Sequence, residues 1–464
     1  MNMIYGVKDR PKFGQTLIFA IQQLLAIMAA TLVVPVITNA ATGSTLSPAA
    51  ALFGAGIGTL VYLLFTRFRS PVFLGSSFAF LGSMAAAFAG GVSMSLGYVG
   101  LIIGAFFAGL VYVIIAAIVK VAGVNWLQKL MPVVVIGPTV AIIGLSLAGN
   151  AVSDLMAGSV VDASGATLAS PLITVLCGIV SLFVTMLCST YGKKMVRLIP
   201  FIIGILAGYV VAAIFTAIGN AAGIDALKVL DFSKLSVLWE NGVTLKTFVN
   251  YELITKDLVF LKAMDGLKEL NGSYIGAIAV AYVPVAFVVF AEHVADHENI
   301  SSIIGHDLLV DPGLSRTLLG DGVGSMAGAF FGGCPNTTYG ESVACVAITR
   351  NASVVTILAT ALCAIVVSFF SPFVAFVNSI PGCVMGGTCV ALYGFIAVSG
   401  LKMIQQVDLG RNHNLFVVST ILVTGIGGLS LTFGKIIITP IAVALILGIL
   451  ANVILKKENR QEKN

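Results

Sequence analysis

The feature that most constrains the fold is a series of long apolar runs that follow one another along almost the whole chain. A helix needs about 20 mostly apolar residues to cross a bilayer, and this requirement predicts fourteen membrane-spanning segments. We expect them at 14–38, 50–66, 71–90, 97–119, 130–149, 170–190, 198–217, 274–295, 315–332, 335–349, 353–376, 380–401, 414–432 and 436–455.

The distribution of charge agrees with a membrane protein. Only 10% of the residues are charged and 58% are hydrophobic, whereas soluble domains carry about 25% charged residues. A net charge of +5 could suggest nucleic-acid binding, but the basic residues are spread over short loops between apolar runs. There they act as topology signals rather than as a binding patch. We therefore expect a multi-pass protein of the cell membrane, surrounded by lipid, with no nucleic-acid partner.

The loops also predict the orientation of the chain. Of the Lys and Arg residues in short loops, all but Lys435 fall on the side of the two termini. The remaining lysines of the chain lie in one long loop at 220–273. The positive-inside rule therefore predicts cytoplasmic termini and an extracytoplasmic long loop. This loop separates two halves of seven segments each, and an odd number per half means that any repeat would be inverted in topology.

Two short strings at equivalent places in the halves resemble each other: PVFLGSSFAF at 71–80 and PNTTYGE at 335–341. Each begins with proline and continues with two hydroxyl residues, an aromatic residue and a small one, and each is followed by helix-compatible sequence. Half-extended segments are tolerated at membrane depth only where protein or a cavity satisfies their backbone. Interrupted segments at corresponding positions indicate the binding site of a transporter.

Four carboxylates lie in apolar segments: Glu292, Asp296, Asp321 and Glu341. Glu292 and Asp296 are one helical turn apart. Glu341 follows the extended part of its segment, where helix N–H groups are free. Charges in membrane segments are costly and usually functional. The alternative is a helix-end side chain that reaches interfacial water, and it applies most to Asp296 and Asp321, which lie nearer predicted helix ends.

Enzymatic alternatives have weak support. The string from His293 to His297, HVADH, resembles the HxxEH spacing of a zinc peptidase with Asp in place of Glu. We expect both histidines at the cytoplasmic end of their segment instead, and no metal site. The cysteines show no CxxC spacing, and no ATP-binding GxxxxGK[ST] string is present. The sequence thus favours a secondary transporter over an enzyme or an ATP-driven pump.

The strings IQQLLAIMAATLVVP, LGSSFAF, FAEHVADH and CPNTTYGESVACVAITR together resemble the nucleobase/ascorbate transporter family, most closely its bacterial uracil permeases. The resemblance covers essentially the whole chain. It implies an all-α polytopic membrane protein with fourteen segments in two inverted repeats and short antiparallel strands in segments three and ten. It also implies a core domain (1–129 and 274–379), a gate domain (130–219 and 380–455), the loop 220–273 and a cytoplasmic tail at 456–464.

The resemblance also implies a substrate site. The implied residues are Ala30, Phe78, Glu292, Tyr339, Gly340 and Glu341. Glu292 and Glu341 match the two carboxylates that bind the nucleobase in the family. Phe78 and Gly340 match backbone contacts, Tyr339 precedes the second of these, and Ala30 matches a residue lining the pocket. Gln22-Gln23 stands where the family usually has Gln-His.

The implied chemistry fits a proton-coupled importer. Uracil has two N–H donors and two carbonyl acceptors, which suit carboxylates and free backbone N–H groups, and Phe78 or Tyr339 could flank its ring. We expect Glu292 to carry the coupling proton, because protonation removes a costly charge. Asp296 and Asp321 are the other proton-coupling candidates. The proton is the coupling ion, and no further cofactor is expected.

The substrate stays open between uracil and a purine such as xanthine. Asp296 stands where uracil permeases have His, and Asp321 where they often have Asn, which are features of the purine and xanthine members. Glu341 matches the uracil type, since xanthine and urate members usually carry Gln there. Ser342 and Ala344 replace Asn and Gly of the family pattern.

Other transport classes and the oligomeric state are also open. A facilitative channel or an anion exchanger could share the architecture. A channel would show rings of charge, and anion-exchange relatives usually carry a soluble C-terminal domain. The resemblance further implies a homodimer formed through segments twelve and thirteen.

Overall fold

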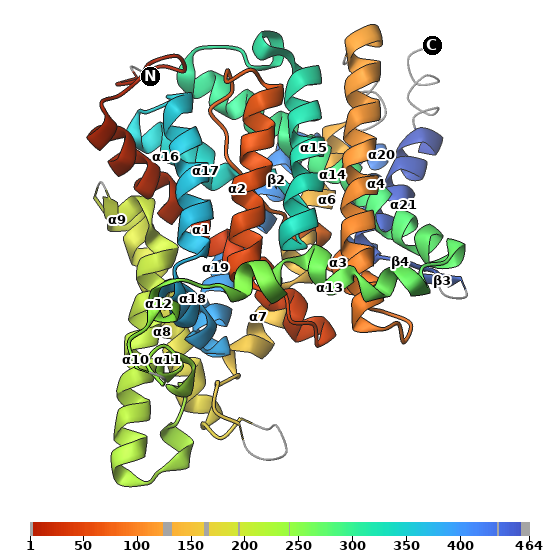
Figure 1. Ribbon diagram of the computed structural model, residues 1–464. Helices are drawn as coiled ribbons and strands as arrows, with labels where there is room; N and C mark the ends of the chain where they lie inside the picture. The colour runs from red at the N-terminus through yellow and green to blue at the C-terminus, as the bar shows by residue number, and fades with distance from the viewer. Residues whose placement is uncertain are drawn as a thin grey trace, which may run out of the picture.

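The part of the chain that the structure describes is a bundle of long helices with two small two-stranded sheets (Figure 1). The computed structural model describes residues 3–123, 132–161, 167–193, 195–240, 242–433 and 436–455. Within these ranges, eight helices are long and apolar enough to cross a membrane, and further apolar helices are shorter. The chain is thus a multi-pass helical membrane protein, while the fourteen-segment count and the inverted repeat stay predictions. The boundary predicted between 129 and 130, Lys435 and the tail 456–464 fall outside the described residues.

The elements follow the predicted segments closely. The first half contains α1 (Phe13–Thr42), α2 (Pro48–Phe65), β1 (Leu74–Ser76), η1 (Phe78–Phe80), α3 (Leu81–Ala87), α4 (Met94–Ala122), α6 (Val133–Ser146), α7 (Ala148–Leu155), α8 (Pro171–Tyr191), α9 (Met195–Leu198) and α10 (Pro200–Ala222). The predicted long loop contains η2 (Asp225–Leu227), α11 (Ser233–Ser236), α12 (Leu245–Phe248), η3 (Leu253–Asp257), α13 (Val259–Ala263) and η4 (Asp265–Glu269).

The second half contains α14 (Gly272–Ile304), η5 (Leu309–Gly313), α15 (Leu314–Gly332), β2 (Asn336–Thr338), α16 (Gly340–Thr349), α17 (Val354–Ser368), α18 (Ser371–Ser379), α19 (Gly382–Ile404), α20 (Asn412–Ile426), β3 (Leu431–Phe433), β4 (Ile436–Ile438) and α21 (Pro440–Leu455). The start of α1 and the end of α21 lie at the same end of the bundle (Figure 1).

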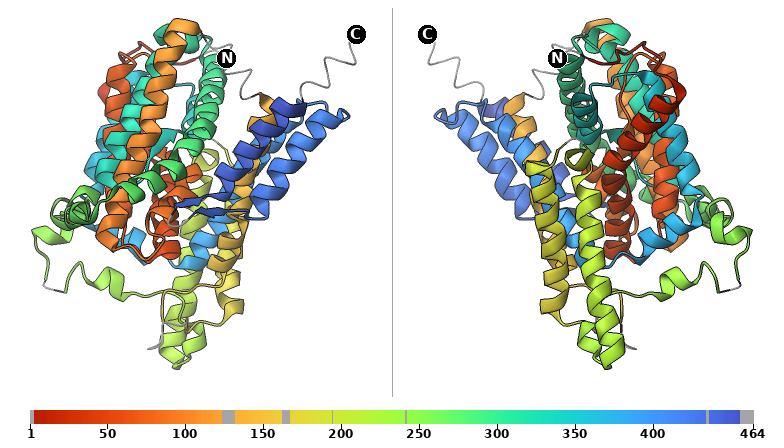
Figure 2. Two further views of the ribbon diagram at one scale, coloured as in Figure 1. Left: turned by 90° about the vertical axis from the view of Figure 1, so that its right-hand side faces the viewer. Right: turned by 90° about the vertical axis from the view of Figure 1, so that its left-hand side faces the viewer.

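The helices pack as two sets, which Figure 2 shows side by side. In the first set α15 packs against α2 and α4, α14 against α4, and α17 against α1 and α2. In the second set α19 packs against α6 and α8, α10 against α8, and α20 against α6 and α21. Contacts of α1 with α10 and of α14 with α6 and α21 join the sets. Each set combines helices from both halves of the chain.

The interrupted segments form the strands that the sequence predicts. β1 and β2 pair antiparallel, with Leu74 opposite Thr338, Gly75 opposite Thr337 and Ser76 opposite Asn336. All six strand residues are buried. A buried extended segment must satisfy its backbone N–H and C=O groups inside the protein. Here each strand forms backbone hydrogen bonds with the other strand.

Two expectations about helix ends were wrong. The helix α14 continues to Ile304 instead of ending near 295, so His293 and His297 lie inside it and are fully buried rather than at a cytoplasmic end. The segments predicted at 414–432 and 436–455 each include a strand, because β3 and β4 form an antiparallel pair. β-branched residues at 436–438 favour extended backbone. The length of an apolar run does not by itself distinguish a strand from a helix.

The contact between α2 and α15 leads to a first prediction. A Cβ added at Gly58 would lie 2.5 Å from Asn336 Nδ2 and 2.7 Å from the Gly324 carbonyl oxygen. Overpacking of this kind typically costs about 1–3 kcal/mol. We therefore expect Gly58→Ala to lower the apparent melting temperature of the detergent-purified protein. Gly276→Ala in α14 is the matched control, since a Cβ there meets nothing within 4 Å. Equal melting temperatures for both variants would contradict this account of the packing.

Candidate functional site

The paired strands are held in place by polar side chains of α2 and α15. The Thr59 hydroxyl accepts a hydrogen bond from the Leu74 N–H (3.0 Å) and donates to the Leu74 carbonyl (3.2 Å). The Asn336 N–H donates to Ser325 Oγ at 2.9 Å, and the Asn336 side chain donates to the Gly54 carbonyl at 3.3 Å. These bonds satisfy groups that the two-stranded sheet leaves unpaired, and they fix the sheet between the helices.

Each strand leads into a short helix whose first N–H groups have no partner within the helix. The first of these helices begins at Phe78 after Ser77, and the second, α16, begins at Gly340 after Tyr339. Both starts line a cavity of about 440 Å³ between the two helix sets. The second set contributes apolar side chains from α6, α10 and α19 to this cavity, among them Val140, Phe201 and Leu392.

Three of the predicted carboxylates line this cavity: Glu292 and Asp296 from α14, and Glu341 from the first turn of α16. Thr338 Oγ1 donates a hydrogen bond to Asp296 Oδ2 at 2.7 Å. No ion pair in the described part of the chain includes any of the three. The cavity thus combines closely spaced carboxyl groups with the positive ends of two short helices.

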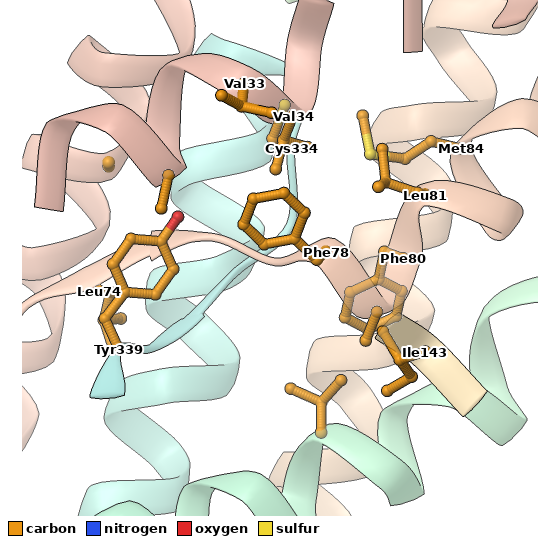
Figure 3. Packing of buried hydrophobic residues seen from close by; sticks show 14 of the residues in the cluster. Val33, Val34, Leu74, Phe78, Phe80, Leu81, Met84, Ile143, Cys334 and Tyr339 are labelled. Atoms are coloured by element: carbon orange, nitrogen blue, oxygen red, sulfur yellow. The ribbon is translucent and has the colours of Figure 1, made fainter. Parts of the chain in front are cut away.

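The two predicted aromatic residues also line the cavity, and one of them stabilises the strands. The Tyr339 hydroxyl donates to the Ser76 carbonyl at 2.6 Å, and a Cβ at Gly75 would collide with the Tyr339 ring. The Phe78 ring meets the Tyr393 ring of α19 edge-on, with centroids 6.0 Å apart. Figure 3 shows Phe78 and Tyr339 within the buried cluster. Phe78 therefore lies where the two helix sets meet.

Two predicted site residues lie away from the cavity. Ala30 is buried in α1 and does not line the cavity, whereas Ala26, one turn earlier, does. Asp321 is buried in α15, and its Oδ2 lies 2.6 Å from His293 Nδ1. It does not reach interfacial water, contrary to the helix-end alternative.

The histidines of the HVADH string contact protein groups rather than a common ligand position. His293 faces Asp321 and Thr317, and His297 faces the His293 carbonyl and the Tyr62 hydroxyl. The described residues contain no cluster of three potential metal ligands. The sequence pattern of a zinc peptidase is therefore not accompanied by the geometry of one in this part of the chain.

Two departures from the family pattern contact each other. Gln23 Nε2 donates to Ser342 Oγ at 2.6 Å, and the same oxygen accepts from the Phe73 N–H at 3.2 Å. This contact ties α1 to the second interrupted segment and to the residue before β1. Sequence reasoning noted Gln23 and Ser342 separately and missed their contact, because they are 319 positions apart.

Comparison with known proteins identifies the family. Residues 14–433 match the model of the Permease family (Xan_ur_permease). The chain is 37% identical to the uracil permease of Bacillus caldolyticus, over 99% of this chain and 96% of the relative. It is 35% identical to the uracil permease of Bacillus subtilis (strain 168), over 98% of this chain and 96% of the relative.

A solved structure shares the fold. The transmembrane domain of the cyanobacterial bicarbonate transporter BicA is similar to this chain with a TM-score of 0.61 and 13% sequence identity, covering 96% of this chain and 99% of that one. At this identity the likeness concerns the fold alone. The sequence relatives are permeases, which are transporters and not enzymes. The chain therefore belongs to the Permease family, whose members include these bacterial uracil permeases.

Proposed function

We propose that this protein imports uracil together with a proton across the cytoplasmic membrane by alternating access. The observation that carries the proposal is that Glu292 and Glu341 line the same cavity. Glu341 lies in the first turn of a short helix, and Glu292 lies one helical turn from Asp296. The names of the relatives, which are uracil permeases, support the choice of substrate.

The chemistry of the cavity complements uracil. The Glu341 carboxylate and the carbonyl oxygen of the protonated Glu292 carboxyl group accept from the two ring N–H groups, and the free N–H groups at Phe78 and Gly340 donate to the two carbonyls. The volume of about 440 Å³ lies within the range of about 300–1,000 Å³ that is common for small-molecule sites. Apolar side chains from the second helix set close the site against the ring faces.

We infer proton coupling from the free-energy cost of placing several ionised carboxyl groups near one another in the cavity. Glu292 lies near Asp296, Glu341 and Asp321, so negative charges would repel one another in a low-dielectric site. A proton on Glu292 relieves this repulsion and leaves Glu341 free to accept a hydrogen bond from the substrate. Substrate binding then favours proton uptake, and proton release into the cytoplasm favours substrate release.

Alternating access is proposed to use the two helix sets as moving bodies. The first set corresponds to the predicted core domain and the second to the gate domain, with the cavity between them. The cavity lining continues to Ser189, Arg197 and Met403, next to connections that the sequence assigns to the cytoplasmic side. We therefore assign this structure to the inward-facing state, with both termini in the cytoplasm.

A purine such as xanthine is the second candidate substrate. Asp296 lines the cavity and adds an acceptor, which suits the larger set of N–H donors on xanthine. A facilitative channel or an anion exchanger is the alternative of another class, and the fold shared with the bicarbonate transporter BicA is compatible with it. A cavity lined by three carboxyl groups disfavours an anionic substrate.

Replacing the proposed proton carrier should uncouple transport. With one coupled proton, a pH difference of about one unit supports about tenfold accumulation of uracil. We expect Glu292→Gln to lose this accumulation in proteoliposomes, because the amide cannot be protonated, while uracil exchange continues with a raised KM. Glu298→Gln is the control, since Glu298 is exposed on the same helix. Undiminished accumulation by Glu292→Gln would remove Glu292 from the coupling step.

Replacing the second carboxylate should change substrate choice. In Glu341→Gln an amide replaces an acceptor-only group, and an unsatisfied buried hydrogen bond costs about 1–3 kcal/mol. We expect uracil affinity to fall about tenfold or more, with a smaller loss for xanthine. Uptake of labelled uracil with uracil, xanthine, hypoxanthine and thymine as competitors measures both. An unchanged uracil-to-xanthine ratio would exclude this role for Glu341. A native protein that is blocked by xanthine and indifferent to uracil would overturn uracil as the substrate.

A further inference from the structure

A buried polar chain lies behind the cavity, between α14 and α15. His293 Nδ1 is 2.6 Å from Asp321 Oδ2, and His293 Nε2 is 3.0 Å from Thr317 Oγ1. Thr317 Oγ1 is in turn 3.0 Å from the Leu314 carbonyl oxygen. The side chains of His293, Asp321 and Thr317 are at most 1% exposed. None of these groups lines the cavity.

We propose that the His293–Asp321 pair is a second proton-binding site of this protein, which exchanges its proton with Glu292 during transport. The pair can hold or release one proton without leaving any buried polar atom unsatisfied. Its role in the transport cycle rests on the proton-coupled function proposed above, whereas proton binding by the pair does not.

The two protonation states follow from the partners of each atom. Without the extra proton, the His293 Nδ1–H donates to the Asp321 carboxylate, and the Thr317 hydroxyl donates to His293 Nε2. With the proton, Asp321 is a carboxylic acid that donates to Nδ1, and Nε2–H donates to Thr317. The Thr317 hydroxyl hydrogen then turns to the Leu314 carbonyl. Every donor has an acceptor in both states, and the net charge changes from −1 to zero.

Protonation also removes a buried charge, which distinguishes this pair from the neighbouring histidine. The ring of His297 stacks on that of His293 with centroids 4.1 Å apart. His297 Nδ1 must carry hydrogen, because it faces the His293 carbonyl at 2.8 Å, and its Nε2 faces the Tyr62 hydroxyl at 2.7 Å. A second proton on His297 would create a buried cation without a contacting carboxylate, which is costly.

A route from the cavity to the pair passes Thr337 and Tyr112. Thr337 lines the cavity, and the Tyr112 ring packs edge-on against the His293 ring with centroids 6.2 Å apart. The hydroxyls of Thr337 and Tyr112 are buried, and neither forms a hydrogen bond with a protein group in the described residues. In this proposal the two hydroxyls relay the proton between Glu292 and the pair, and each hydroxyl turns to face its next partner as the proton passes.

The surroundings favour a neutral pair. The titratable groups within electrostatic range of it are Glu292, Asp296 and His297 on α14, Tyr62 on α2 and Tyr112 on α4. They are carboxyl groups, phenols and an imidazole that faces a carbonyl. Any charge on the carboxyl groups repels a charge on Asp321, so protons on Glu292 and on the pair are linked.

The test uses proteoliposomes with a trapped pH-sensitive dye and labelled uracil. Counterflow of uracil without a pH gradient measures substrate exchange, and the dye measures protons that enter with uracil. We expect Asp321→Asn and His293→Gln to keep the KM for counterflow within about twofold. Under a pH difference of about one unit, we expect their accumulation to be about tenfold lower than that of the native protein.

Two further sets of variants separate proton binding from a structural role. His297→Gln changes a buried histidine of the same helix, and we expect it to retain proton-driven accumulation. Thr317→Val removes the switching hydroxyl and should reduce accumulation, whereas Thr317→Ser restores it. If Asp321→Asn does not reach the membrane, the two Thr317 variants still distinguish proton binding from a structural role.

The outcomes are distinct for the two proposals. If Asp321→Asn or Thr317→Val exchanges uracil and accumulates it like the native protein, the pair is only a structural contact and the inference is wrong. If the native protein shows no uracil counterflow, the substrate proposal fails instead. In that case the uptake of protons with xanthine, measured on the same variants, tests the pair.

Discussion

The pairing of two three-residue strands at membrane depth is the interaction on which the rest of the structure depends. Lipid offers no hydrogen-bond partners, so extended backbone inside the bilayer must pair within the protein. β1 and β2 pair with each other, and Thr59, Ser325 and Asn336 satisfy their remaining groups. Because each strand ends at a helix start, the pairing brings two sets of free N–H groups to one cavity. The position of the site is therefore a consequence of backbone hydrogen bonding.

The buried acidic residues on the two sides of α14 have different partners. Glu292, Asp296 and Glu341 face the cavity without a cationic partner in the described ion pairs, so a proton or a polar substrate must offset their cost. Asp321 faces away and is matched by His293 within the first helix set. The first arrangement suits exchange with substrate and solvent, and the second suits storage inside the protein.

Much of the site could be predicted from the sequence, because charges and helix breakers are conspicuous in apolar segments. Glu292, Glu341 and the strand segments were identified from these signals, whereas Phe78 was identified from the resemblance to the family. The partner of Asp321 could not be predicted, because His293 is 28 positions away and was expected at a helix end. Ala30 illustrates the same limit, since one helical turn separates it from the cavity-lining Ala26.

The sequence by itself determined that the chain crosses a membrane many times, where its helices are interrupted and which acids lie in apolar surroundings. These properties depend on local composition and on the free-energy cost of charge in lipid. Only the tertiary structure decided which acids share the cavity and which one pairs with a histidine. The rotation of each helix about its axis depends on packing against its neighbours, and that rotation determines that Asp296 faces the cavity while Asp321 does not.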